Sequence, residues 1–330
     1  MSSLDPWEKR YVKLFASNSH GQIFSDQYVI ARVPDGMVFV AAEDWPDPVK
    51  HRLAAEYGES YNTPYDFAID KYETSANGSV PNCDPEYDFP CTTSGFTGYL
   101  ESTGATPAIN LNWYSHKTGC DRRTDILGAD WADTGLSPGD PSGRRVHLAT
   151  GVEWMVASFG TPDSIGPQFC HNHRDFWNPG TPASAGSMER CQSRYGARNM
   201  IGNQEEWANE LADNGVMYTY WIDDDLGEDI GLSGGWDVAT GFITSWNFNL
   251  AFPMSTSWTQ SAAFSESDHF GENSGSLSSY GSRAQAARRG ALWDGGSRAG
   301  RFRLRLNHGP TGTNSSLGGR CSLASPATAP

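Results

Sequence analysis

Cysteines are the residues of this sequence with the greatest capacity for redox and metal chemistry, and their spacing disfavours both. None of the six stands in a C-x-x-C pair, so neither a zinc ribbon nor a thioredoxin-like motif is predicted. Cys83 and Cys91 flank one loop, and Cys170 and Cys191 flank another. Either pair could close its loop as a disulfide, or remain as two buried thiols in a reducing compartment. The first residues lack the basic-then-apolar order of a secretory signal, so we expect buried thiols slightly more.

Histidines beside cysteine or carboxylate residues are the other candidate metal ligands. His171 and His173 follow Cys170, but two histidines so close along an extended chain chelate poorly without a turn. We therefore expect loop histidines, and interpret the lone His147 and His269, which lies near two acidic residues, in the same way.

Other motifs that carry chemistry are missing from the sequence. It has no glycine-rich phosphate loop, no G-x-S-x-G elbow and no H-E-x-x-H helix. The acidic run 223–229 (DDDLGED) lacks the alternate spacing of a calcium-binding EF-hand loop. We predict that it is a solvated acidic loop, because runs of like charge are usually exposed.

The secondary structure predicted from residue patterns is dominated by short strands and loops. A capping box at Thr150 and Glu153 marks the start of one helix. A second helix is expected over residues 48–57, and strands are expected over 27–33, 37–42, 67–72 and 217–222. Few helices among strands that return late in the chain indicate an α+β fold.

Composition excludes several classes of partner. The 330 residues carry a net charge of −15, which disfavours nucleic acid and anionic membranes because phosphates would be repelled. The 40 aromatic residues are typical of a folded protein, and no apolar run reaches the roughly 18 residues that a membrane-spanning helix needs. We expect no direct membrane insertion. The location stays open between a virion, the cell surface and the cytoplasm.

Four segments, in order, resemble the formylglycine-generating enzyme family. They are residues 67–73 (FAIDKYE), 107–113 (PAINLNW), 145–154 (RVHLATGVEW) and 199–207 (NMIGNQEEW), closed by 317–321 (LGGRC). The resemblance implies a C-type lectin-like fold, loop-rich, with short antiparallel strands and few helices. It predicts one domain over 63–323, with 1–62 as an N-terminal extension or small β-containing module packed on it. Residues 324–330 are expected to be a disordered tail.

The resemblance also bears on catalysis and on metal binding. The family oxidises a substrate cysteine with two cysteines shortly before its terminal motif, whereas residues 300–307 (GRFRLRLN) contain none. We therefore expect no enzyme activity and no required cofactor. The family also builds a calcium site around its G-N-x-W-E-W motif, which implies a structural calcium site at Asn199, Gly202, Gln204 and Glu206. The alternative is that Glu206 and Asn199 merely satisfy backbone donors of the loop.

Residues 291–321 (ALWDGGSRAGRFRLRLNHGPTGTNSSLGGRC) resemble a second and more specific pattern, the variable region of diversity-generating retroelement proteins. In that pattern asparagine codons are altered by adenine mutagenesis between fixed framework residues. The implied framework residues are Trp293, Gly296, Ala299, Gly300, Phe302, Leu304, Leu306, Pro310, Leu317, Gly318, Arg320 and Cys321. The implied variable, ligand-binding positions are Asp294, Gly295, Arg298, Arg303, Arg305, His308, Gly312, Ser315 and Ser316.

The residue pattern of this segment agrees with that division. Apolar residues at 302, 304 and 306 alternate with arginines at 301, 303 and 305, which is the period of a strand with one buried face. Five arginines and one aspartate give 291–321 a charge of +4. The arginines could merely pair with the acidic body, or could display ligand-binding groups.

We hypothesise a non-enzymatic protein that binds a protein or other macromolecule through a diversified surface. The alternatives are a divergent oxygen-dependent enzyme of the formylglycine-generating family and a carbohydrate binder of fixed specificity. The identity of the ligand and the oligomeric state stay open.

Overall fold

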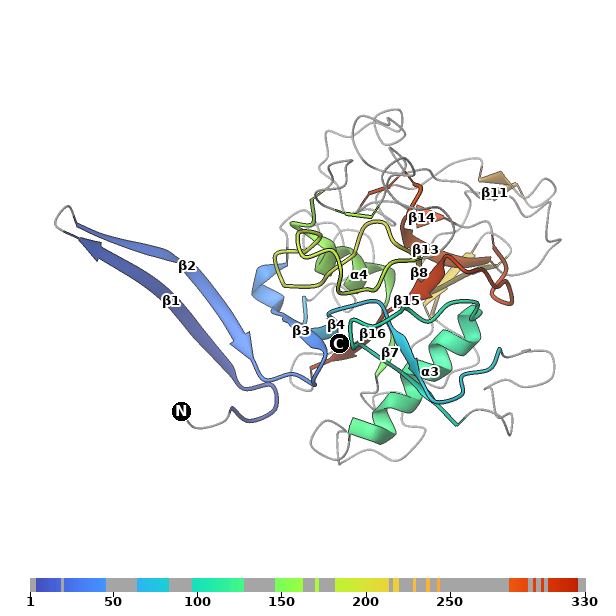
Figure 1. Cartoon of the computed structure of the whole chain (residues 1–330), viewed down its shortest axis with the longest axis horizontal. Coiled ribbons are helices and arrows are strands. Elements are labelled where there is room, and N and C mark those ends of the chain that lie inside the picture. The colour runs from blue at the N-terminus through green and yellow to red at the C-terminus, as the bar shows by residue number, and fades with distance from the viewer. Residues whose placement is uncertain are drawn as a thin grey trace.

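The computed structural model shows a β-rich body from which one long hairpin extends (Figure 1). It describes residues 4–18, 21–45, 64–82, 97–127, 146–162, 170–171, 182–213, 216–219, 228–229, 236–237, 242–243, 285–295, 299–300, 304–305 and 308–325. No helix of these ranges is long and apolar enough to cross a membrane.

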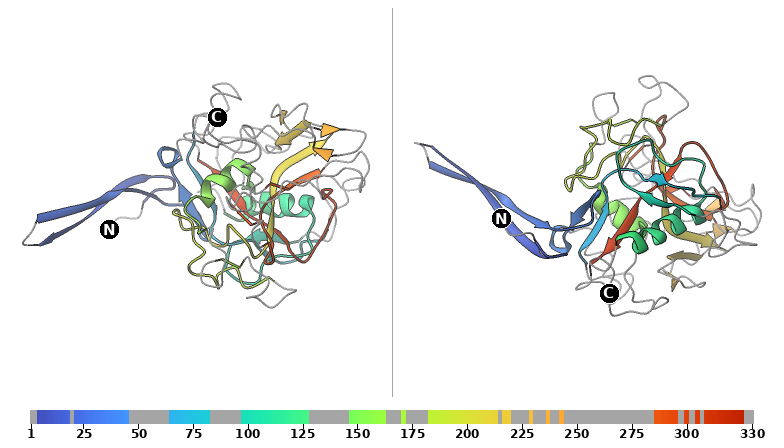
Figure 2. Two further views of the ribbon diagram at one scale, coloured as in Figure 1. Left: turned by 90° about the horizontal axis from the view of Figure 1, so that it is seen from above. Right: turned by 60° about the horizontal axis from the view of Figure 1, so that its bottom comes forward.

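The N-terminal part contains a hairpin and one strand of the body. Strand β1 (Lys9–Asn18) pairs antiparallel with β2 (Gly21–Ala31), and all views show this hairpin standing clear of the body (Figures 1 and 2). Strand β3 (Met37–Val40) instead joins the body by pairing with β4 (Phe67–Asp70). Residues 4–45 therefore contribute both an extension and an edge strand of the main sheet. The helix expected over 48–57 lies outside the described residues.

A four-stranded sheet with the order β3-β4-β16-β7 forms one half of the core. Strand β16 (Cys321–Ala324) lies between β4 and β7 (His147–Leu148), antiparallel to both. The expected tail therefore begins later than 324, because Ala324 ends β16 and the Ser325 amide donates to the Asp66 carbonyl at 2.8 Å. The last strand in the sequence is thus an interior strand of the sheet.

A second sheet has the order β10-β9-β8-β13-β14 and carries Glu205 and Arg305. Its long central strand, β8 (Glu205–Asp213), pairs antiparallel with β9 (Val216–Thr219) and β13 (Gln285–Gly290), and parallel with β15 (Leu317–Gly319). At its ends lie β10 (Glu228–Asp229) and β14 (Leu304–Arg305). Residues 228–229, the described end of the acidic run 223–229, therefore form a strand and not the predicted loop.

The remaining described elements are short, apart from two helices. Helix α3 spans Trp113–Leu127 and α4 spans Gly151–Ser158. The predicted capping box is confirmed, because Thr150 accepts from the Glu153 amide while the Glu153 carboxylate accepts from the Thr150 amide. The small elements are β5 (Ser75–Asn77), β6 (Tyr99–Glu101), β11 (Trp236–Asp237), β12 (Phe242–Ile243) and the 3-10 turn Ala42–Asp44. This small helix content and these short antiparallel strands agree with the α+β prediction.

Two disulfides link segments that the sequence separates. Cys170 and Cys191 are bonded, with their Cα atoms 4.7 Å apart, so the expectation of buried thiols is wrong for this pair. Cys120 of α3 is bonded to Cys321 of β16, a pairing that the sequence did not indicate. Cys83 and Cys91 lie outside the described residues.

Candidate functional site

Seven of the eight framework residues of 291–321 that the structure describes are buried. The side chains of Ala299, Leu317, Arg320 and Cys321 are at most 3% exposed, and Gly300, Pro310 and Gly318 are buried as well. Trp293 differs, because it is only partly buried. Gly296, Phe302 and Leu306 lie outside the described residues, as does the side chain of Leu304.

Five of the assigned variable positions are partly exposed. They are Asp294, Arg305, His308, Gly312 and Ser315. Arg298 and Arg303 lie outside the described residues, so the outward face expected for the arginines rests on Arg305 alone.

Two assigned variable positions do not fit a display role. Gly295 is buried, and a Cβ atom there would lie 2.7 Å from the Cβ of Ala291. This glycine is therefore required by close packing, and a larger residue would force the backbone to move. Ser316 is 9% exposed, its carbonyl accepts from the Glu205 amide, and its own amide donates to the Asn314 side chain. Both are corrections to the assignment, because these residues hold the segment in place.

Arg305 lies at the edge of a cluster of charged side chains on β8, β13 and β14. Its Nη1 is 3.2 Å from Glu205 Oε1, while the other oxygen of Glu205 accepts from Arg288 at 2.5 Å. Glu205 and Arg288 are almost fully buried, whereas 23% of the Arg305 side chain is exposed. Arg305 therefore both pairs with the acidic body and reaches the surface, which combines the two roles considered for the arginines.

His308 adds an uncharged ring to this cluster. Burial, followed by the positive charge of Arg288, lowers the pKa of His308 to about 4. The ring is consequently neutral at neutral pH, so it has one nitrogen that can donate a hydrogen bond and one that can accept one.

The loop that follows β14 is held to the body through its backbone. The carbonyl of His308 accepts from Ala286 of β13, that of Pro310 accepts from Trp113 at the start of α3, and that of Asn314 accepts from Asn110. Thr311 and Thr313 between these anchors are exposed, as is Asn314. Neither threonine was predicted as a variable position, because the resemblance assigned only glycine and serine positions in this loop. A fixed backbone with exposed side chains is suited to recognition, since little ordering is needed when a ligand binds.

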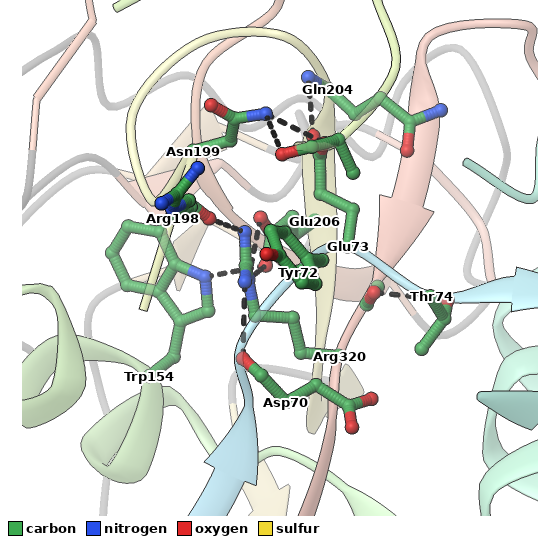
Figure 3. A network of polar contacts seen from close by, with 12 residues as sticks. Asp70, Tyr72, Glu73, Thr74, Trp154, Arg198, Asn199, Gln204, Glu206 and Arg320 are labelled. Carbon is green, nitrogen blue, oxygen red and sulfur yellow. Dashed lines mark hydrogen bonds and ion pairs between the residues drawn. The ribbon is translucent and has the colours of Figure 1, made fainter. Parts of the chain in front are cut away.

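Beneath this surface, Arg320 joins three parts of the chain (Figure 3). Its Nε donates to both oxygens of Glu206, at 3.0 and 2.8 Å, and its Nη1 donates to the Asp70 carbonyl at 3.2 Å. Its Nη2 donates to the Arg198 carbonyl, and Trp154 Nε1 donates to Glu206 at 2.8 Å. Arg320 and Glu206 are both fully buried, so this ion pair fixes the end of the variable segment against β4, β8 and the loop before β8.

Glu206 of this ion pair is also one of the four residues expected to bind calcium, with Asn199, Gly202 and Gln204. Asn199 Nδ2 and the Gln204 amide both reach the carboxylate of Glu73, at 3.4 and 3.1 Å, so Glu73 is a member of the site that sequence reasoning did not assign. Gly202 and Asn199 have φ angles of 83° and 56°, which turns the loop sharply. The side-chain oxygens of Asn199 and Gln204 are buried without a hydrogen-bond partner in the part of the chain that the structure describes.

The carboxylates of this site are strongly affected by burial. Burial and the nearby charge of Glu206 raise the pKa of Glu73 to about 8. Burial likewise raises the pKa of Glu206, although Arg320 opposes this. Neutral oxygens without partners and two carboxyl groups are ligands that calcium accepts, so the residues fit the ion by donor type. The Glu206 carboxylate, however, already holds Arg320 and Trp154.

The histidines have structural partners where they are described. His147 is a buried residue of β7 and not a loop residue, and its Nε2 is 3.0 and 3.2 Å from the two oxygens of Glu153. His171 Nδ1 is 2.9 Å from Asn203 Oδ1. His173 and His269 lie outside the described residues, and within those residues no three His, Cys, Asp or Glu side chains gather in a way that could hold a metal ion.

Comparisons with known proteins give structural matches only. No protein-family model matches the sequence, and no curated protein matches it. Among solved structures, Treponema denticola variable protein 1 has a TM-score of 0.42 and 14% identity, over 95% of this chain and 99% of that one. The Major Tropism Determinant P3c variant has a TM-score of 0.34 and 13% identity, over 78% of this chain and 50% of that one. PvdO from Pseudomonas aeruginosa has a TM-score of 0.37 and 14% identity, over 79% and 82%.

Proposed function

We propose that this chain is a non-enzymatic binding protein in which residues 291–321 form a diversified recognition surface on a fixed C-type lectin-like scaffold. Its ligand would be a protein or another macromolecule, recognised by side chains that differ between copies of the gene. The mechanism is affinity and not turnover, because a rigid backbone lowers the ordering cost and the side chains select the partner.

One observation carries this proposal: apart from Trp293, Gly295 and Ser316, burial among the described residues of 291–321 follows the division into framework and variable positions. Leu317, Arg320 and Cys321 are at most 1% exposed, while Arg305 and His308 reach the surface. The backbone carbonyls of the intervening loop are bonded to the body, which supports a frame that stays constant when the side chains change.

Deep sequencing of the coding segment for 291–321 from many isolates tests the proposal. We expect substitutions at codons 294, 298, 303, 305, 308, 312 and 315, arising by adenine changes from a nearby template copy, and none at 317, 320 or 321. Substitutions spread evenly over both sets, or an invariant segment, would contradict diversification. An invariant segment would favour the carbohydrate binder of fixed specificity, which a glycan array would then detect.

The same division predicts different effects on stability. Leu317→Ala is expected to lower the free energy of unfolding by about 2–5 kcal/mol, because it leaves a cavity in the core. Arg305→Ala is expected to cost less than about 1 kcal/mol, since its ion pair is partly exposed and Glu205 keeps Arg288. Urea unfolding of both variants measures the difference. Equal losses would show that Arg305 is a core residue and not a display residue.

We also propose that Asn199, Gly202, Gln204 and Glu206 hold a structural calcium ion. The two amide oxygens without partners support this site. Removing the ion with EGTA is expected to lower the melting temperature by about 5 °C or more, because an ion that binds only the folded state stabilises it. Added calcium should restore the melting temperature, whereas magnesium should not. A melting temperature that EGTA leaves unchanged would remove the calcium site and leave the recognition surface untouched.

A further inference from the structure

The β1–β2 hairpin extends from the body on the side away from β13 and β14 (Figures 1 and 2). Its strands are 10 and 11 residues long, longer than any other described strand. Two strands alone are marginally stable in water, and both outer edges carry unpaired backbone groups. Such a ribbon is expected to gain stability from a partner.

The root of the hairpin is held firmly, so the hairpin is presented in a defined direction. Lys9 Nζ lies 3.0 Å from Glu43 and 2.8 Å from Asp66, and the Tyr11 hydroxyl donates to Glu43 at 3.1 Å. The ring of Trp7 packs edge-on against that of Phe39 in β3, with the ring centroids 6.4 Å apart. A pre-oriented arm loses little freedom on binding, which favours association.

Both faces of the ribbon carry apolar residues. Tyr11 is opposite Val29, and the next pair along, Arg10 and Ile30, faces the other way, because successive strand residues alternate between faces. The Tyr11 side chain is 59% exposed and that of Ile30 is 46% exposed. The sequence of residues 11–16 (YVKLFA) places apolar residues at successive positions of the strand. A ribbon with one solvated face would alternate apolar and polar residues, and this one does not.

Length and charge indicate which partner fits. The two strands together supply 21 residues, and each side of a standard protein interface contributes about 20–30. Residues 9–31 contain three basic residues and one acidic residue, a net charge of +2, within a chain of net charge −15. The arm is therefore complementary in charge to the acidic body of a second copy, and a two-fold dimer in which each arm lies on the body of the other copy forms both contacts at once.

We propose that the β1–β2 hairpin is an association arm that docks on a second copy of this chain. The arm covers its exposed apolar faces in the dimer, and the strands β13 and β14 of each copy point away from the contact. This inference stands independently of the recognition surface, because it needs no ligand.

Sedimentation velocity of the full chain at about 10 µM, a concentration at which interfaces of standard size associate, tests the proposal. The wild-type chain is expected to be dimeric, and Ile30→Thr is expected to raise the dissociation constant at least tenfold. Threonine keeps strand propensity while removing apolar surface. The matched control is Ile126→Thr, which makes the same replacement at an exposed isoleucine of α3 and should leave the dimer intact.

A second variant guards against misfolding of the first. Lys13→Glu reverses the charge of an exposed arm residue without touching the apolar faces, and is expected to weaken the dimer through charge repulsion. Thermal unfolding confirms that each variant is folded. A monomeric wild-type chain would overturn the proposal, as would a dimer that the arm variants leave unchanged or that Ile126→Thr weakens as much. A wild-type chain that is monomeric alone but binds another protein through the arm would also overturn it.

Discussion

Arg320→Met is expected to lower the free energy of unfolding by about 3–5 kcal/mol, one of the two largest effects in this protein. The guanidinium is fully buried and forms an ion pair with Glu206, while also donating to the carbonyls of Asp70 and Arg198. Methionine fills a similar volume but leaves Glu206 as a buried charge without its partner. Urea unfolding, with a slope unchanged from the wild type, measures the loss.

Two further variants separate the ion pair from simple packing. Arg305→Met removes an arginine that is partly exposed, and should cost less than about 1 kcal/mol. Glu206→Gln added to Arg320→Met should recover part of the loss, because the unpaired charge is then gone. If the double variant were less stable than Arg320→Met by the full cost of Glu206→Gln alone, the two side chains would act independently and the explanation by charge would be wrong.

Removing the Cys120–Cys321 disulfide, by replacing both residues with alanine, is expected to cost about 5 kcal/mol. The bond joins positions 201 residues apart, and cross-linking so long a loop strongly restricts the unfolded chain. It also ties β16 to α3, so the centre of the four-stranded sheet loses an anchor. Urea unfolding under non-reducing conditions gives the value.

The second disulfide provides the matched comparison. Cys170 and Cys191 are separated by 21 residues, so replacing both by alanine should cost about 3 kcal/mol by the same reasoning. The order of the two losses is the test. If removing Cys170–Cys191 were the more damaging change, strain or local packing, and not loop length, would control the contribution of these bonds.

Local signals in the sequence were sufficient for some elements. The capping box at Thr150 and Glu153 predicted the start of α4, because both partners lie within one turn. Motif resemblance also identified buried framework positions such as Leu317 and Cys321. Both kinds of signal depend on residues that are close in sequence or that match a known pattern.

Features that depend on distant contacts could not be predicted. The pairing of Cys120 with Cys321 requires knowing that α3 packs against β16, and Glu73 meets Asn199 only after the chain has folded. The sequence pattern places Gly295 at a variable position, yet its neighbour Ala291 leaves no room for a side chain there. Helix α3 was not predicted either, because its many polar residues and Gly119 leave no regular helical spacing of apolar residues in the sequence.

The interior position of β16 affects how altered copies of the gene would be screened during synthesis. The ribosome makes β16 only after it has passed codons 291–320, yet this strand fills the gap between β4 and β7. A frameshift or premature stop within those codons removes the strand, so β4 and β7 lose the strand that pairs with both of them. The incompletely folded product is then degraded by proteases. Folding itself would therefore discard defective versions before any of them met a ligand.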